Sequence, residues 1–113
     1  MKTLNYYQEQ ARKFDIYKGN MSITHNVLKL VGESGEIAEK LGKLMRDRDI
    51  DDFNSLSDDI KLELVKELGD VLWYIARLSE HLGYTLAQTA QINMDKLQSR
   101  KDRGKLKGSG DNR

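Results

Sequence analysis

Two short acidic motifs in this sequence have the residue types and the spacing that a metal site needs. Glu33 and Glu36 form the first pair, and Glu67 and Asp70 form the second. On a helix, the i, i+3 spacing places the two carboxylates of a pair on one face, where both can reach one ion. Neither pair includes a histidine or a cysteine, so the oxygen ligands favour Mg²⁺, with Mn²⁺ as a substitute, over Zn²⁺. The same absence argues against a di-iron site, which needs a Glu-x-x-His motif.

The positions of the two pairs on their helices make them more informative than a chance pairing of acids. A single i, i+3 pair arises by chance in most charged helices and carries little weight. On a helical wheel, however, Glu33 lies at the margin of an apolar stripe beside Ile37, and Glu67 lies at the margin of another beside Ile60. If the two stripes face each other, the four acids converge where the core meets solvent. Carboxylates held so close repel one another, and a divalent cation is the usual means of neutralising them.

Capping residues and apolar spacing predict four helices that carry these motifs. The expected helices span approximately residues 4–17, 25–46, 58–82 and 86–101. Their expected N-caps are Thr3, Thr24, Ser57 and Thr85. Gly83 is expected to end the third helix in a left-handed conformation. No long stretch alternates with the period of a strand. The sequence therefore predicts an all-α protomer that resembles a four-helix bundle, with two long central helices.

The apolar faces of the two central helices predict self-association. Apolar residues cover an arc of about 140° on the second expected helix and about 160° on the third. Stripes this broad often pack against two neighbours, and a domain of 113 residues gains burial by sharing them. We therefore expect a homodimer or a homotetramer.

The composition argues against several other classes of function. The chain has no cysteine, which removes disulfides, zinc–thiolate clusters and thiol nucleophiles. Its longest uninterrupted apolar run, Val71 to Ala76, is six residues long. A membrane span needs about 20 such residues, so no membrane partner is expected. The first residues also lack the apolar run of a secretory signal, and we expect a cytoplasmic location.

The chain divides into an expected helical domain, residues 1–101, and a basic tail that contains glycine, residues 102–113. Residues 100–113 carry six Lys and Arg against two Asp, whereas the preceding residues are mildly acidic. Such a tail is typical of a disordered segment, and it also suits an anionic partner. One alternative function is therefore a non-catalytic helical module that contacts nucleic acid or another partner through this tail. A purely structural dimerisation bundle is another alternative. The acidic motifs favour neither of these two alternatives. They also argue against nucleic acid as a partner.

Two longer stretches around the acidic pairs carry a family resemblance. The segments LVGESGEIAE at residues 30–39 and KELGDVLWY at residues 66–74 resemble the MazG family of all-α nucleoside triphosphate pyrophosphohydrolases. The motif of that family is E-x-x-E, a connection of variable length, and E-x-x-D. The closing run, which begins KLQSRKDRG at residue 96, resembles a small, single-domain branch. The resemblance implies Mg²⁺-dependent hydrolysis of a (deoxy)nucleoside triphosphate between its α and β phosphates. Members of the family often remove non-standard or surplus nucleotides, a house-cleaning role.

The resemblance also implies roles for individual residues. The metal ligands would be Glu33, Glu36, Glu67 and Asp70. Either Glu36 or Glu67 would accept the proton of the attacking water, and the sequence leaves this choice open. Asn93, Lys96 and Arg100 match positions that contact the nucleotide, and their spacing puts them on one helical face. Tyr74 lies on the same stripe as Asp70 and could stack on the base or ribose, with packing at the core edge as the alternative. For His25 and Asn26 a helix-start or surface role is favoured over contact with the base.

Overall fold

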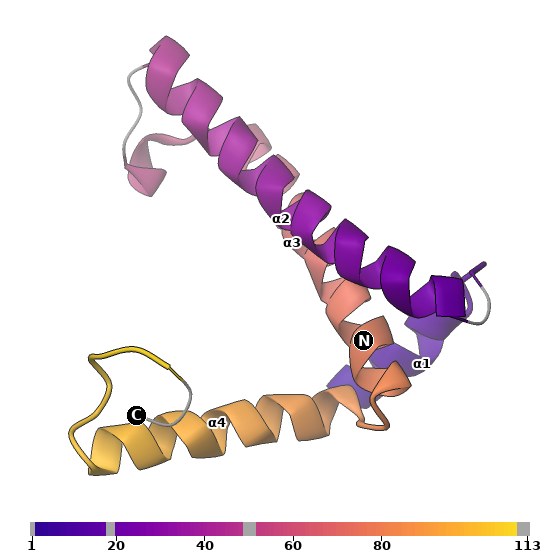
Figure 1. Ribbon diagram of the computed structural model, residues 1–113. Helices are drawn as coiled ribbons and strands as arrows, with labels where there is room; N and C mark the ends of the chain where they lie inside the picture. The colour runs from indigo at the N-terminus through magenta and orange to yellow at the C-terminus, as the bar shows by residue number, and fades with distance from the viewer. Residues whose placement is uncertain (1, 18–19, 49–51, 111–113) are drawn as a thin grey trace.

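The computed structural model describes residues 2–17, 20–48 and 52–110, and within these residues it is entirely helical (Figure 1). The four α-helices are α1 (Leu4–Arg12), α2 (Asn20–Arg48), α3 (Asp58–His81) and α4 (Leu86–Asp102). A short 3₁₀ turn, η1 (Phe53–Ser55), follows α2. The predicted all-α class and the two long central helices are confirmed. None of the described helices is both long and apolar enough to cross a membrane.

Three of the four predicted N-caps are confirmed. The hydroxyl of Thr3 accepts a hydrogen bond from the Tyr6 N–H at 3.0 Å, and that of Ser57 accepts one from the Ile60 N–H at 3.3 Å. Thr85 forms a reciprocal capping box with Gln88, in which each side chain accepts a hydrogen bond from the backbone N–H of the other residue. Satisfied N–H groups fix where α1, α3 and α4 begin.

The ends of the third and fourth helices also follow the sequence. Gly83 has a φ of +86°, the left-handed conformation that glycine adopts without steric cost, and it turns the chain from α3 into α4. α3 ends at His81 and α4 ends at Asp102, each within one residue of the predicted end.

Two predicted boundaries are wrong. α1 ends at Arg12 instead of near Tyr17. The chain turns there through backbone hydrogen bonds between residues three positions apart, and Arg77 of α3 then holds Asp15. α2 begins at Asn20 instead of near His25, so Thr24 lies inside the helix and is not its N-cap. Tertiary contacts explain the earlier start, because they hold the first turns of α2 in place. The His25 ring stacks on the ring of Tyr17, with centroids 3.7 Å apart.

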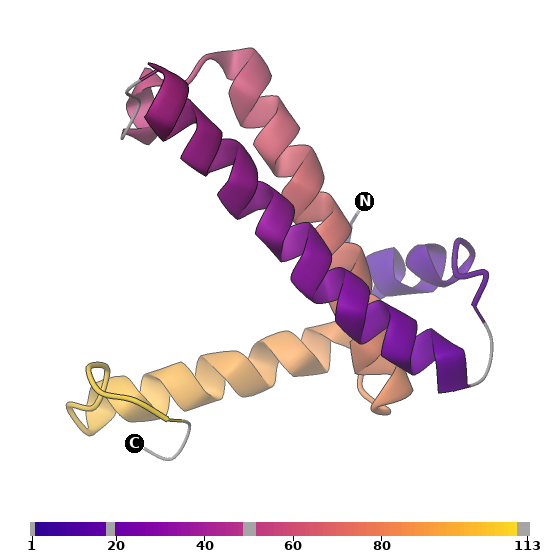
Figure 2. The same ribbon diagram turned by 45° about the horizontal axis from the view of Figure 1, so that its top comes forward.

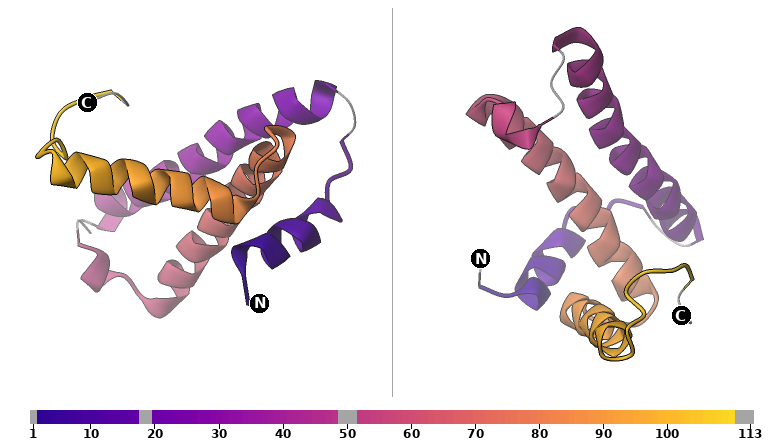
Figure 3. Two further views of the ribbon diagram at one scale, coloured as in Figure 1. Left: turned by 90° about the horizontal axis from the view of Figure 1, so that it is seen from below. Right: turned by 90° about the vertical axis from the view of Figure 1, so that its left-hand side faces the viewer.

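The helices are arranged around α3. α2 and α3 lie side by side as an antiparallel hairpin, and α1 packs across the C-terminal part of α3 (Figures 1 and 2). After Gly83, α4 runs away from the hairpin instead of packing along it (Figures 1 and 2), and the right-hand view of Figure 3 looks along α4. In the described part of the chain α4 contacts α1 and α3 but not α2. A single chain therefore does not close into a four-helix bundle.

A buried polar junction fixes α1, α3 and α4 relative to one another. The Gln8 side chain is 5% exposed and donates to the carbonyl oxygens of Ala76 and Tyr84, at 3.1 and 3.2 Å. Its own amide oxygen accepts the Leu86 N–H at 2.9 Å, in the first turn of α4. The Trp73 indole N–H donates to the Ala11 carbonyl at 3.1 Å. Side-chain hydrogen bonds of Gln8 and Trp73 thus join these three helices.

The second part of this junction is a buried ion pair. Arg77 Nε donates to Asp15 Oδ2 at 2.7 Å, and both side chains are at most 6% exposed. Arg77 also pairs with Glu80. The remaining oxygen of Asp15 accepts the Tyr17 N–H at 3.0 Å, so the ion pair fixes the segment that follows α1.

Much apolar surface stays uncovered in the single chain. Its accessible surface is 8579 Å², whereas a compact monomer of 13.0 kDa exposes about 6,300 Å². The radius of gyration is 16.9 Å, against about 13 Å for a compact domain of this length. On the hairpin, Val31, Val65 and Leu68 are each more than half exposed. The broad apolar stripes predicted on α2 and α3 are thus only partly covered by this chain.

Replacing Gln8 by leucine is expected to destabilise the fold by about 2–4 kcal/mol, because one N–H and two carbonyl groups lose their buried partner. Denaturation in urea should show a lower midpoint with an unchanged slope. Gln10→Leu is the matched control, since the Gln10 amide oxygen accepts a hydrogen bond from the exposed Lys13 ammonium at 2.8 Å and takes no part in the junction. Equal losses of stability in the two variants would contradict this role for Gln8.

Candidate functional site

The α2–α3 hairpin brings three of the four predicted acidic residues together. One carboxylate oxygen from each of Glu33, Glu67 and Asp70 lies within 4.8 Å of the other two. Glu33 comes from α2, and Glu67 and Asp70 come from successive turns of α3. The side chains of Glu33 and Glu67 are only 13% and 15% exposed. We call Glu33, Glu36, Glu67 and Asp70 the acidic cluster, because Glu36 also interacts with this group.

The pKa values show that the acidic cluster is short of positive charge. The pKa of Glu36 is raised, because a proton shared with the Glu67 carboxyl and the charges of Glu33 and Glu67 favour its neutral form. The pKa of Asp70 is raised by burial first and then by the charges of Glu33 and Glu67. Both shifts oppose the charged form. A cation in the cluster would relieve this.

The four residues suit a hard divalent cation. Every donor is a carboxylate oxygen, the ligand type that Mg²⁺ and Mn²⁺ prefer. In addition, Oε2 of Glu67 is buried and has no hydrogen-bond partner among the described residues. A buried carboxylate oxygen without a partner is costly, and coordination to a cation would satisfy it.

Two lysines that sequence reasoning missed flank the acidic cluster. Lys40 Nζ donates to Glu67 Oε1 at 2.7 Å, across the hairpin, and Lys29 Nζ lies 3.6 Å from Glu33 Oε1. Lys40 lowers the pKa of Glu67, although burial acts in the opposite direction. Helical spacing could have indicated Lys29, which precedes Glu33 by four residues, whereas Lys40 meets Glu67 only because α2 and α3 face each other.

A cavity of about 520 Å³ adjoins the acidic cluster. Its lining residues are Phe14, Ile16, Tyr17, Glu33, Asp70, Trp73 and Tyr74. We call it the aromatic pocket. Tyr74 was predicted to lie near Asp70, and both line this pocket. Trp73 is half-buried against α1. Sequence reasoning missed residues 14–17, because they were assigned to the first helix.

Asn26 and His25 are more buried than expected. Asn26 is fully buried, so a surface role is wrong for it, whereas His25 is half-buried near the start of α2 and stacks on Tyr17.

The predicted nucleotide contacts on α4 lie away from the acidic cluster in one chain. Asn93 is exposed and Lys96 is half-buried. Arg100 is 5% exposed, and its guanidinium donates to the Gly110 carbonyl at 3.3 Å, where the tail folds back on α4. Because α4 runs away from the hairpin (Figures 1 and 2), one chain does not bring these three residues to the cluster.

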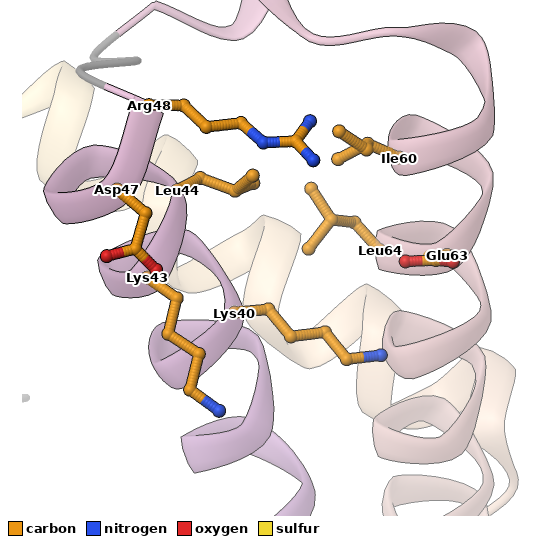
Figure 4. Close-up of a pocket in the computed structure, with 8 residues that line it drawn as sticks. All are labelled: Lys40, Lys43, Leu44, Asp47, Arg48, Ile60, Glu63 and Leu64. Atoms are coloured by element: carbon orange, nitrogen blue, oxygen red, sulfur yellow. The ribbon is translucent and has the colours of Figure 1, made fainter.

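A second cavity, of about 270 Å³, lies farther along the hairpin, between the ends of α2 and α3 (Figure 4). Its lining residues are Lys40, Lys43, Leu44, Asp47, Arg48, Ile60, Glu63 and Leu64. We call it the basic pocket. Lys40 reaches from α2 toward α3 at one side of it, whereas Lys43 stays along α2 (Figure 4). The acidic cluster therefore has an aromatic cavity on one side and, on the side of Lys40, a cavity lined by three cationic and two acidic residues.

Comparisons with known proteins agree with this geometry. Residues 21–104 match the family described as MazG nucleotide pyrophosphohydrolase domain. This range contains the whole acidic cluster. The chain is also 41% identical, over 116 aligned positions, to "Gene 37 protein" of Mycobacterium phage L5. That alignment covers 97% of this chain and 98% of the phage protein. No solved structure matches the chain significantly.

Asp70→Asn is expected to stabilise the protein in the presence of EDTA, because it removes a charge that the other carboxylates oppose. A rise in Tm on the order of 2–4 °C is expected by differential scanning calorimetry. Glu39→Gln, on the exposed face of α2, is the control and should leave Tm unchanged. The Glu39 carboxylate pairs with Lys43, outside the acidic cluster.

The difference in stability between Asp70→Asn and the wild type is expected to change with pH in one direction. Since the pKa of Asp70 is raised on folding, its charge opposes folding at neutral pH, and the penalty disappears as the pH falls below that raised pKa. In EDTA, the Tm advantage of Asp70→Asn over the wild type should therefore shrink as the pH is lowered from neutral, through that raised pKa, toward the ordinary aspartate pKa of about 4. An advantage that stays constant or grows would contradict this account.

Proposed function

This chain belongs to the MazG nucleotide pyrophosphohydrolase family, and we propose that it hydrolyses (deoxy)nucleoside triphosphates between the α and β phosphates. The products are a nucleoside monophosphate and pyrophosphate, and the role is removal of surplus or altered nucleotides. The observation that carries the proposal is the approach of Glu33, Glu67 and Asp70 oxygens to within 4.8 Å on facing helices. A purely structural hairpin has no use for this costly arrangement.

The acidic cluster would hold Mg²⁺, or Mn²⁺ in its place. When bound, the metal supplies positive charge to the phosphate oxygens and to the departing pyrophosphate. A triphosphate carries up to four negative charges, so the unaccompanied carboxylates would repel it. The carboxylates of Glu33, Glu67 and Asp70 act as ligands in this scheme, and the hairpin sets their positions.

Glu36 is the proposed proton acceptor for the attacking water. Its side chain is exposed at the edge of the acidic cluster, where water can reach it, whereas Glu67 is mostly buried and engaged by Lys40. A positioned carboxylate within hydrogen-bond reach of the water can serve as a general base. Glu67 remains the alternative base.

The aromatic pocket is the proposed place for the nucleoside. Tyr74 lies in the same wall as Asp70, so a base stacked on the Tyr74 ring would leave the α phosphate at the acidic cluster. Phe14 and Tyr17 offer further apolar surface to the base.

The cationic contacts on α4 are proposed to reach the site of a second chain. Asn93, Lys96 and Arg100 are carried on a helix that leaves its own hairpin, so they would meet the nucleotide of a partner protomer. A homodimer or homotetramer is supported by the accessible surface of 8579 Å², well above the value for a compact monomer.

Mg²⁺ should be required for the release of pyrophosphate from a deoxynucleoside triphosphate. Glu67→Gln is expected to lower kcat/KM by roughly a hundredfold or more, since it removes a charged ligand of the metal that would stabilise the transition state. Products separated by ion-exchange chromatography would show monophosphate and pyrophosphate, and Glu39→Gln should behave as the wild type.

Two results would count against the proposed reaction. Orthophosphate as the first product would place cleavage at the β–γ bond instead. Full activity of Glu67→Gln, with an unchanged circular dichroism spectrum, would remove the acidic cluster from the chemistry.

Self-association predicts a solution mass of at least twice the 13.0 kDa of one chain. Val31→Asp should shift sedimentation equilibrium toward the monomer, because it puts a charge on the uncovered apolar face of α2. Phe53→Asp is the control, since Phe53 is as exposed as Val31 but lies on η1 outside the hairpin. A wild-type protein that sediments as a monomer would overturn the proposed oligomer.

A further inference from the structure

Lys40 is the cation most closely engaged with the acidic cluster. Its ammonium group lies 2.7 Å from Glu67 Oε1, closer than the 3.6 Å that separates Lys29 from Glu33. Lys40 also reaches from α2 to Glu67 on the facing helix α3, whereas Lys29 pairs with Glu33 one turn away on α2 itself. Three carboxylates within 4.8 Å of one another need such a charge when no metal is bound.

The same contact conflicts with metal coordination. A divalent ion at the unpartnered Oε2 of Glu67 would lie about 2.1 Å from that oxygen, while the Lys40 ammonium stays on Oε1 of the same carboxylate. An ammonium and a metal ion on one carboxylate group repel each other at this range. The Lys40 side chain is 42% exposed on a flexible four-carbon stem, so it can turn away without disturbing the helix.

The direction in which Lys40 can turn is set by the two cavities. The aromatic pocket lies on the Glu33 and Asp70 side of the cluster, and the basic pocket lies on the Lys40 side. A nucleotide with its base in the aromatic pocket and its α phosphate at the cluster would extend its β and γ phosphates toward Lys40. Figure 4 shows Lys40 crossing from α2 toward α3 at the edge of the basic pocket.

We propose that Lys40 is an internal counter-cation that neutralises Glu67 in the metal-free protein and moves to the pyrophosphate end of the nucleotide when metal and substrate bind. The inference rests on the proposed function, and it adds a role for a residue outside the acidic motifs. Lys40 thus weakens metal binding in the free protein and strengthens substrate binding once the metal is present.

Lys40→Met separates these two effects, because it removes the charge and keeps the length of the side chain. Isothermal titration calorimetry without nucleotide should show Mn²⁺ binding that is roughly threefold to tenfold tighter than in the wild type. With excess Mg²⁺, the same variant should bind pyrophosphate roughly threefold to tenfold more weakly. Its affinity for a nucleoside monophosphate should be unchanged, because that ligand has no phosphate beyond the α position.

Lys61→Met is the matched control, in the first turns of α3. Lys61 is exposed and is among the lining residues of neither the aromatic nor the basic pocket, so all three affinities should match the wild type. Lys40→Arg keeps the charge and should restore the wild-type order of affinities. Mn²⁺ affinity in Lys40→Met that is unchanged or lower would overturn the proposal, and so would unchanged pyrophosphate affinity.

The wild-type protein distinguishes failure of this inference from failure of the proposed function. If the wild type binds no Mn²⁺ and releases no pyrophosphate, the proposed function fails. If the wild type does both, and Lys40→Met behaves like Lys61→Met, only the role of Lys40 fails.

Discussion

Mutual repulsion among carboxylates on two facing helices is the constraint around which this protein is organised. Glu33 on α2 and the pair Glu67 and Asp70 on α3 are held closer together than like charges tolerate without compensation. The long antiparallel hairpin keeps them there, because α2 and α3 pack against each other. Burial raises the pKa of Asp70, and the charges of Glu33 and Glu67 raise it further. The cluster thus has a built-in demand for cations.

The remainder of the fold positions the residues that surround the acidic cluster. The Asp15–Arg77 ion pair and the Gln8 hydrogen bonds fix the segment after α1 and the start of α4 against α3. This is why Tyr17 and Tyr74, which are far apart in sequence, share one cavity beside Asp70. The protein uses buried polar contacts at this junction because it has few buried apolar residues. Only Ala11, Leu56, Leu64, Ala76 and Leu86 are buried apolar residues among the described part of the chain.

The sparse core connects the fold to the proposed assembly. One chain leaves apolar residues on α2 and α3 in water, and it sends α4 outward with the residues expected to contact phosphate. In the proposed oligomer these two features are explained together, since a partner would cover the exposed stripes and receive the outward helix. Stability and substrate binding would then depend on the same contact between protomers.

The sequence by itself determined the features that depend on residues a few positions apart. These are the caps at Thr3, Ser57 and Thr85, the left-handed turn at Gly83 and the two acidic pairs, because a hydrogen bond or a helical face joins residues within one or two turns. The convergence of the pairs was also predictable, since broad apolar stripes force the two long helices to face each other.

Tertiary structure alone decided where α1 ends, which residues form the aromatic pocket, which lysine neutralises Glu67 and where α4 points. Arg77 holds Asp15 from 62 residues away, and Lys40 meets Glu67 across 27 residues. Such contacts depend on how whole helices pack, and no local pattern of residues encodes them. The path of α4 depends on contacts with α1 as well as α3, so the spacing of Asn93, Lys96 and Arg100 could place them on one helical face but could not place that face in the molecule.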